Sequence, residues 1–287
     1  MFFGTDLAAE RQRMVGDLPG IGKNEYTVGD AAVSEITVSD EAASQAIGRP
    51  AGRYVTVTVP SMEVSRRIFD GRVRALADCL KKMIPPTGKI LFVGLGNPGI
   101  TSDAFGPLTA GKILATGHLG ADDVEKARLP AVRPVCVLAP GVAGDTGMEA
   151  SDIVKSVCAD LKPSAVIAAD ALAAGDLSRV GCTFQLTDTG ISPGSGVKNP
   201  RRRLDGTTLG VPVIALGVPT VINAVRAAEC IFGKALDAPP RKEYADTVVT
   251  VREADKMVER AAAMAGAAVN LALQPALTAK ELAELTA

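Results

Sequence analysis

This chain contains no tryptophan and a single histidine, and only 3% of its 287 residues are aromatic. A hydrophobic core must therefore be built mainly from Ala, Val, Leu and Ile, for which the hydrophobic content of 47% provides ample material. The single histidine, His118, cannot form a histidine-rich metal site. The five cysteines are odd in number and have no Cys-x-x-Cys spacing, which indicates reduced thiols and not a disulfide framework.

Two further absences concern charge and long apolar runs. The net charge of −1 gives no electrostatic basis for binding nucleic acid or an anionic membrane, and the run Arg201–Arg203 is too short to change this. No segment reaches the roughly 18 apolar residues that a membrane span needs. Residues Met1–Asp6 lack the basic and then apolar pattern of a signal peptide. We therefore expect a cytoplasmic protein that binds neither nucleic acid nor membrane.

From residue 89 onward, short apolar runs alternate with amphipathic segments. The predicted strands cover residues 89–95, 133–139, 164–169, 182–186 and 211–216. The predicted helices between them cover residues 105–116, 148–161 and 220–232, with a short helical piece through Leu172. This alternation predicts an α/β fold, a three-layer sandwich with a mostly parallel central sheet.

The N-terminal region has a different character. Residues 1–50 are polar and rich in glycine, which predicts irregular structure with short strands. Residues 53–60 alternate apolar residues with threonine and end in proline, which predicts an exposed or edge strand. Residues 61–83 have helical periodicity.

We expect residues 1–233 to form a catalytic α/β domain with this strand-rich N-terminal extension. Residues 234–287 are predicted to form a linker and C-terminal helices that pack on the same domain or on a neighbouring subunit. The helices are expected at 251–273 and 279–285, the second with Thr278 as its N-cap.

Two apolar runs each lead to an aspartate. The strand at 89–95 is followed, after a glycine-rich turn, by Asp103, and the strand at 164–169 is followed directly by Asp170. In an open parallel sheet, ligands bind in the crevice at the carboxyl ends of the strands. We therefore expect both aspartates to project into one crevice, where two carboxylates can share a proton and activate a water. This pattern indicates an enzyme, and a hydrolase in particular.

Each of the two aspartates also has a structural interpretation. Asp103 can equally serve as the N-cap of the helix at 105–116. Asp170 has apolar residues on both sides, and burial of a lone carboxylate is unfavourable, so a purely structural role is harder to explain there.

The string Gly94–Gly99 has the glycine spacing of a dinucleotide-binding fingerprint. Pro98 inside the turn and the delayed start of the helix at Phe105 argue against nucleotide binding, as does the lack of an acidic residue ending a second strand about 20 residues on. The same string follows a strand in peptidyl-tRNA hydrolases. Those enzymes need a downstream catalytic histidine, and His118 lies in an unrelated context.

Glycine-rich loops supply candidate backbone N–H groups for a ligand. Such groups can receive an extended ligand or stabilise an oxyanion. The candidate substrate-binding or oxyanion-loop residues are Gly96, Asn97, Gly141, Gly190, Ser195 and Gly196. We predict no bound metal ion and no cofactor.

Several strings, taken in order, are similar to the germination proteases of spore-forming bacteria. Each string is weak alone, but their order and spacing together are specific, and the resemblance runs from Thr5 to about Phe232. The strings are Val93–Asn97, Thr101–Pro107, Ala139–Val142, Ala169–Ala174, Asp188–Ile191, Pro193–Val197 and Thr208–Thr220.

The resemblance implies an endopeptidase of the developing spore core that degrades small acid-soluble spore proteins during germination. It implies a homotetramer made as a zymogen, a fold like that of the hydrogenase maturation proteases (a phosphorylase/hydrolase-like fold), and an atypical aspartic type of catalysis by Asp103 and Asp170. The family cuts next to an acidic residue, so a basic subsite is expected, for which Arg201–Arg203 are candidates. The family's propeptide precedes a Thr-Asp-Leu-Ala string, which here is Thr5–Ala8, so we expect little propeptide to be removed.

Two alternatives remain open at this point. One is a metal-dependent peptidase of the maturation type on the same fold, in which His118 is the only histidine that could join the aspartates as a third ligand. The other is a non-catalytic module that binds a peptide or a nucleotide in the same cleft.

Overall fold

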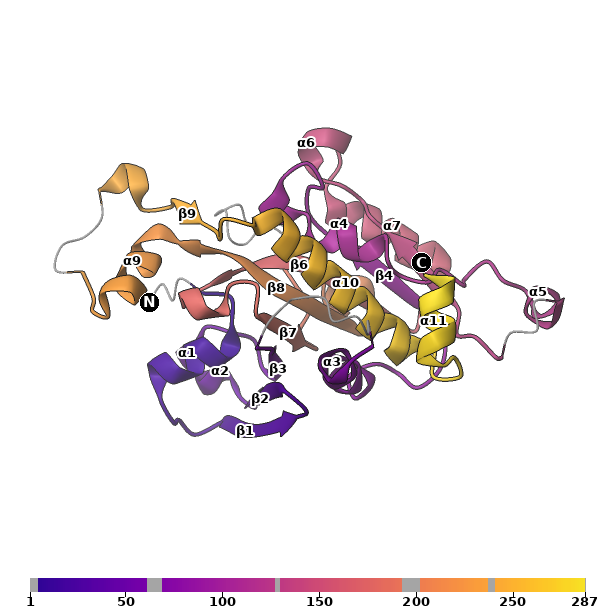
Figure 1. Ribbon diagram of the computed structural model, residues 1–287, viewed down its shortest axis with the longest axis horizontal. Helices are drawn as coiled ribbons and strands as arrows, with labels where there is room; N and C mark the ends of the chain where they lie inside the picture. The colour runs from indigo at the N-terminus through magenta and orange to yellow at the C-terminus, as the bar shows by residue number, and fades with distance from the viewer. Residues whose placement is uncertain (1–4, 61–68, 127–129, 193–201, 237–240, 287) are drawn as a thin grey trace.

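The computed structural model describes residues 5–60, 69–126, 130–192, 202–236 and 241–286. In these residues a mixed nine-stranded sheet is covered by helices on both faces, as Figure 1 shows. The strands are β1 (Ile21–Val28), β2 (Ala31–Val38), β3 (Gly52–Thr58), β4 (Ile90–Gly94), β5 (Val135–Leu138), β6 (Ala165–Ala174), β7 (Thr183–Thr187), β8 (Val213–Asn223) and β9 (Val248–Val249).

The helices vary widely in length. The α-helices are α1 (Ala8–Val15), α2 (Glu41–Ile47), α3 (Gly71–Lys81), α4 (Phe105–Ala110), α5 (Ala121–Lys126), α6 (Ala143–Thr146), α7 (Ala150–Leu161), α8 (Gly206–Leu209), α9 (Ala224–Phe232), α10 (Ala254–Leu273) and α11 (Ala279–Leu285). The 3-10 helices are η1 (Thr101–Asp103), η2 (Leu177–Arg179) and η4 (Lys242–Tyr244).

The sheet consists of a parallel part and an antiparallel part. Its strand order is β1-β2-β3-β7-β8-β6-β4-β5, with β9 paired to β8. The neighbours β5, β4, β6 and β8 are parallel, whereas the other pairs are antiparallel. The predicted α/β three-layer sandwich is confirmed. The parallel strands β4, β5, β6 and β8 match four of the predicted strands, but the strand predicted at 182–186, β7, is antiparallel to its neighbours.

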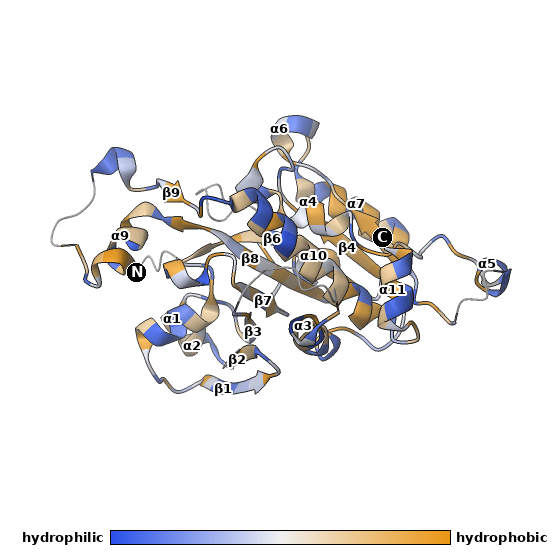
Figure 2. Cartoon of the chain, in the orientation of Figure 1, coloured by the Kyte–Doolittle hydropathy of each residue, from blue (hydrophilic) through white to orange (hydrophobic). Residues whose placement is uncertain are grey.

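The parallel strands are apolar on both sides because helices cover both faces. Along β4, Ile90 and Phe92 pack into a core with α3, α4 and α10, while Leu91 and Val93 pack on the opposite face with α7. Figure 2 shows these strands coloured mainly as hydrophobic and α11 as largely hydrophilic. Within the described part of the chain, none of the helices has the length and apolar character to cross a membrane.

The helix α10 completes the larger core. Its small residues, among them Ala261, Ala265 and Ala268, are fully buried against the helices α3 and α4. The side chain of Asn270 accepts from Leu114 N at 2.9 Å and donates to Lys112 O at 2.8 Å, which ties α10 to the segment after α4. At the following helix, Thr278 forms the predicted N-cap.

The N-terminal region is more regular than predicted. Residues 1–50 contain two helices and the eight-residue strands β1 and β2, because α1 and α2 pack on β2 and β3 through a small core of their own. The segment at 53–60 was expected at an edge, but β3 lies inside the sheet between β2 and β7. The first part of the helix predicted for 61–83 falls outside the described residues, and α3 covers its end.

Two predicted boundaries beside the candidate site are wrong. The strand β6 does not end before Asp170; it continues to Ala174, because β8 runs beside it and supplies partners as far as Ile222. For the same reason Thr220 belongs to β8 and not to a helix, and α9 begins at Ala224. Asp170 therefore lies within a strand, and the short helical piece predicted through Leu172 is part of β6.

Gly106 at the start of α4 offers a test of this packing. A Cβ atom at Gly106 would lie 2.1 Å from Leu95 O and 2.5 Å from Ala169 O, so Gly106→Ala must push α4 away from the ends of β4 and β6. We expect the free energy of unfolding to fall by about 1–3 kcal/mol or more, measured by urea denaturation. Gly111→Ala is the matched control because its Cβ would meet only ordinary contacts of 3.6 Å or longer, and an unchanged Gly106→Ala protein would contradict the packing.

Candidate active site

Asp103 lies in a tight turn that follows β4. Its Oδ2 accepts a hydrogen bond from Asn97 N at 2.7 Å, and its backbone N donates to Ile100 O at 2.8 Å. Gly96 has φ +115°, and a Cβ there would lie 2.1 Å from Asp103 O, so only glycine fits. Asp103 does not cap α4, whose N-cap Ala104 has no side-chain hydrogen bond. Its carboxylate instead closes the turn that contains the predicted residues Gly96 and Asn97.

Asp170 is buried within β6, with an exposed fraction of 6%. Its Oδ1 accepts a hydrogen bond from Ala171 N at 2.9 Å, and its partner across the ladder is Gly217 on β8. Side chains alternate along a strand, so Asp170 shares its face with Ala168 and Leu172. Ala168 belongs to the core beneath α7, which identifies the face on which Asp170 lies.

The structure places both aspartates at the carboxyl end of the parallel strands. Leu95 N, just beyond β4, donates to Ala169 O at 2.8 Å, which holds the residue before Asp170. Thr220 Oγ1 on β8 donates to Ser102 O at 2.6 Å, which holds the residue before Asp103. The two carboxylates thus come from the turn after one strand and from the adjoining strand.

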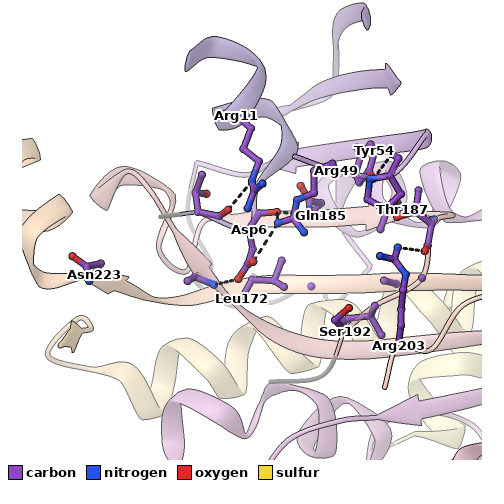
Figure 3. Close-up of a pocket in the computed structure, with 18 of the residues that line it drawn as sticks. Asp6, Arg11, Arg49, Tyr54, Leu172, Gln185, Thr187, Ser192, Arg203 and Asn223 are labelled. Carbon is purple, nitrogen blue, oxygen red and sulfur yellow. Dashed lines mark hydrogen bonds and ion pairs between the residues drawn. The ribbon is translucent and has the colours of Figure 1, made fainter. Parts of the chain in front are cut away.

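A pocket of about 260 Å³ lies on the face of the sheet that carries Asp170. Leu172, two residues along β6, and Gly217, across the ladder, both line it. A Cβ at Gly217 would lie 2.4 Å from Leu172 Cδ1, so the absence of a side chain there makes room for Leu172 over the strand β8. Figure 3 shows Ser192 and Arg203 at one end of the pocket and Asn223 at the other.

The charge of the pocket is positive. Among its described lining residues are three arginines, Arg11, Arg49 and Arg203, and one carboxylate, Asp6. Arg49 pairs with Asp6 at 3.2 Å. Arg203 donates to Thr189 O and pairs with Asp205 at 3.0 Å.

Arg11 is partly buried and bonds to backbone carbonyl groups. Its Nε donates to Thr5 O at 2.9 Å and its Nη1 donates to Gly48 O at 2.8 Å. Burial lowers the pKa of its guanidinium to about 10, so the group keeps its charge at neutral pH.

The N-terminal segment forms one wall of the pocket. Asp6 N donates to Ala173 O at 2.9 Å, and Asp6 Oδ2 accepts from Ala173 N at 2.9 Å. Gln185 on β7 accepts from Ala8 N at 2.7 Å and donates to Asp6 O at 3.0 Å. The segment is therefore fixed between β6 and β7 by bonds that mimic a strand.

Glu10 fastens the other end of this segment. One carboxylate oxygen accepts hydrogen bonds from the Thr5 hydroxyl and, at 2.8 Å, from Gly175 N just beyond β6. Burial raises the pKa of the Glu10 carboxyl above its usual range. The sequence has no local sign of this pocket wall, because its hydrogen bonds to β6 and to Gly175 join residues more than 160 positions apart.

The predicted loop residues have different surroundings. Gly190 lines the pocket, with φ +78° and a Cβ position only 2.2 Å from Leu204 O. Gly141 has φ +73° in the turn before α6. Ser195 and Gly196 lie outside the described residues, as does Arg201.

His118 lies at the opposite end of the sheet from Asp103. It follows Thr116 and Gly117, whose backbone N–H groups both donate to Val135 O, and Val135 pairs with Ile90 at the start of β4. Asp103 follows the other end of that strand. His118 therefore cannot join Asp103 around one metal ion, and no group of three His, Cys, Asp or Glu residues in the described part of the chain could hold one.

Comparisons with known proteins agree with one another over most of the chain. A family model described as germination protease matches residues 4–233. A germination protease from Clostridium perfringens is 35% identical, with 97% of each chain covered. One from Bacillus velezensis is 42% identical over 78% of this chain and 64% of that protein. Among solved structures, the NiFe hydrogenase maturation protease HycI from Thermococcus kodakarensis KOD1 aligns with 65% of this chain and 98% of its own, at 19% identity and a TM-score of 0.35.

Removal of the hydrogen bonds that the Gln185 side chain makes to the N-terminal segment should destabilise this wall of the pocket. Gln185→Leu removes the acceptor of Ala8 N and one of the two side-chain donors to Asp6 O, the other being Arg49 Nη2, and we expect the free energy of unfolding to fall by about 1–3 kcal/mol. Amide hydrogen exchange at Ala8 should accelerate in the same variant. Gln45→Leu is the control, since Gln45 is exposed and bonds only to Glu41 within α2. Equal stability of the two variants would show that the segment is held by other contacts.

Proposed function

Since this chain belongs to the germination protease family, a family of peptidases, we propose that it is an endopeptidase that degrades small acid-soluble spore proteins in the spore core during germination. Asp103 and Asp170 form its catalytic pair. The observation that carries this proposal is that Asp103 lies in the turn after β4 and that Asp170 directly follows the last residue of β6 that pairs with β4. Leu172 and Gly217, the neighbours of Asp170 along and across the ladder, line the pocket.

The proposed mechanism uses a water between the two aspartates. One carboxylate, ionised, takes a proton from the water as it attacks the peptide carbonyl; the other, protonated, donates to the carbonyl oxygen or the leaving amine. Such acid–base assistance is worth about 10²–10⁴-fold in rate. Backbone N–H groups around Gly96 and Gly190 are candidates to stabilise the oxyanion.

The positive pocket supplies the basic subsite. An acidic side chain next to the scissile bond can enter the pocket and contact Arg203, whose guanidinium has five N–H donors of which the carbonyl of Thr189 and the carboxylate of Asp205 use only part. Among the arginines that the sequence suggested for this subsite, Arg201–Arg203, the side chain of Arg202 is exposed and pairs with Asp152. Arg203 is therefore the specificity residue in this proposal.

We also propose that the protein is a homotetramer. Exposed apolar side chains at one end of the molecule support contact with another subunit. Ile231 and Phe232 at the end of α9 are each 69% exposed, and Tyr244 and Val248 are more than half exposed nearby. The mass of the protein in solution, measured by light scattering, tests the assembly.

The catalytic assignment is tested by digesting a purified small acid-soluble spore protein with Asp103→Asn and Asp170→Asn. Each variant loses a group that must take or give a proton, so we expect kcat to fall by at least about 10²-fold. Asp78→Asn, on the exposed side of α3, is the matched control.

Each digestion is run with and without a chelator. Cleavage that resists the chelator and is lost in both variants supports the aspartate pair. Cleavage abolished by the chelator favours a metal-dependent peptidase, and binding of the spore protein without any cleavage favours a non-catalytic module.

Arg203→Met tests the basic subsite. Loss of a charge-assisted contact worth about 1.5–3 kcal/mol should lower kcat/KM by roughly 10- to 100-fold for a peptide with glutamate beside the cleavage site. A peptide with glutamine there should be affected much less. Arg202→Met is the neighbouring control, and the melting temperatures show whether both variants are folded. An equal loss for both peptides would assign Arg203 a structural role only.

A further inference from the structure

The pairing of β6 with β8 contains an irregularity next to the candidate site. Leu172 pairs with Pro219 and the following residue, Ala173, pairs with Val221, so Thr220 is an extra residue on β8. This is the arrangement of a β-bulge, which bends a strand and turns the side chain of the extra residue in a new direction. Pro219, just before it, has no N–H to lose from the ladder.

The side chain of Thr220 is directed at the turn that carries Asp103. The residue is 1% exposed, and its hydroxyl donates to Ser102 O at 2.6 Å. Ser102 precedes Asp103 within η1. The hydroxyl is thus a direct link from the sheet to this short helix.

The bulge residue is itself held from outside the sheet. Thr250 Oγ1, in the segment between β9 and α10, donates to Thr220 O at 2.6 Å. A bulged residue loses its hydrogen-bond partner in the ladder. Here the hydroxyl of Thr250 replaces that partner as the donor to the carbonyl oxygen of Thr220.

We propose that Thr220 is a positioning residue that fixes Asp103 relative to Asp170. Asp170 pairs with Gly217, three residues before Thr220 on the same strand, so β8 contacts the strand of one aspartate and the turn of the other. The proposal rests on the proposed peptidase function for its catalytic consequence. Its geometric part concerns only the placement of the two carboxylates.

The test compares Thr220→Val, which keeps the shape and removes the hydroxyl, with Thr220→Ser, which keeps the hydroxyl. Misplacement of a catalytic group by about 1 Å can lower the rate about 10²-fold, so we expect kcat of Thr220→Val to fall roughly 10- to 100-fold with little change in KM. Thr220→Ser should restore most of the rate. Thr116→Val is the control at the far end of the sheet, because Thr116 is also a buried threonine that donates to a carbonyl, Arg133 O, at 2.5 Å. Its oxygen additionally accepts from Val135 N and Gln274 Nε2, so this control removes at least as many bonds as Thr220→Val.

If Thr220→Val slowed the reaction only by destabilising the fold, the variants would behave differently. If Thr116→Val lowers kcat as much as Thr220→Val, or if Thr220→Ser is as slow as Thr220→Val, the positioning role is overturned. Melting temperatures of all three variants establish that each is folded at the assay temperature.

A second measurement does not depend on activity. Carbon-13 NMR titration of the aspartate carboxyl groups should show altered curves for Asp103 and Asp170 in Thr220→Val, and unaltered curves in Thr116→Val. Altered titration in a protein that cleaves no spore protein would retain the positioning role and reject the proposed function. Unaltered titration together with normal kcat would reject the positioning role.

Discussion

The close contact between the end of β4 and the start of α4 is the constraint on which the candidate site depends. A Cβ atom at Gly94 would lie 2.3 Å from Gly106 O, and one at Gly106 would lie 2.1 Å from Leu95 O. Two glycines therefore let the backbone of the helix touch the backbone of the strands. The ten residues between β4 and α4, which include Asp103, are forced to form a compact turn over this contact instead of extending into solvent.

The same contact reaches the second aspartate through its strand. Gly106 also approaches Ala169 O, and Leu95 N donates to that oxygen, so α4, β4 and β6 meet at one carbonyl. Asp170 is the next residue. The backbone of Asp170 is fixed on both sides. Asp170 itself pairs with Gly217 on β8, and the residues of β6 that precede it pair with β4. The site thus combines one aspartate held by a turn with one held by a strand.

Sequence patterns predicted the parallel part of the fold because its strands are continuous apolar runs with helices between them. They also led to Asp103 and Asp170 as candidates, since polar residues are conspicuous after such apolar runs. The extent of β6 past Asp170 was not predictable, because it depends on partners from β8, and the bulge at Thr220 has no local signature. The pocket was missed for a similar reason: Arg11, Arg49, Tyr54 and Gln185 reach it from helices, loops and antiparallel strands that are brought together only by tertiary contacts.

The C-terminal part of the chain contributes to the site even though the family model ends at residue 233. The helix α10 buries a long apolar face against α3 and α4, and α4 is the helix whose start contacts both candidate strands. Thr250 bonds to the bulge residue, which in turn bonds to the turn of Asp103. Residues 241–273 therefore support the two aspartates from the side of α4 and from the side of β8. A boundary drawn at residue 233 on sequence similarity alone would separate the aspartates from contacts that hold them in place.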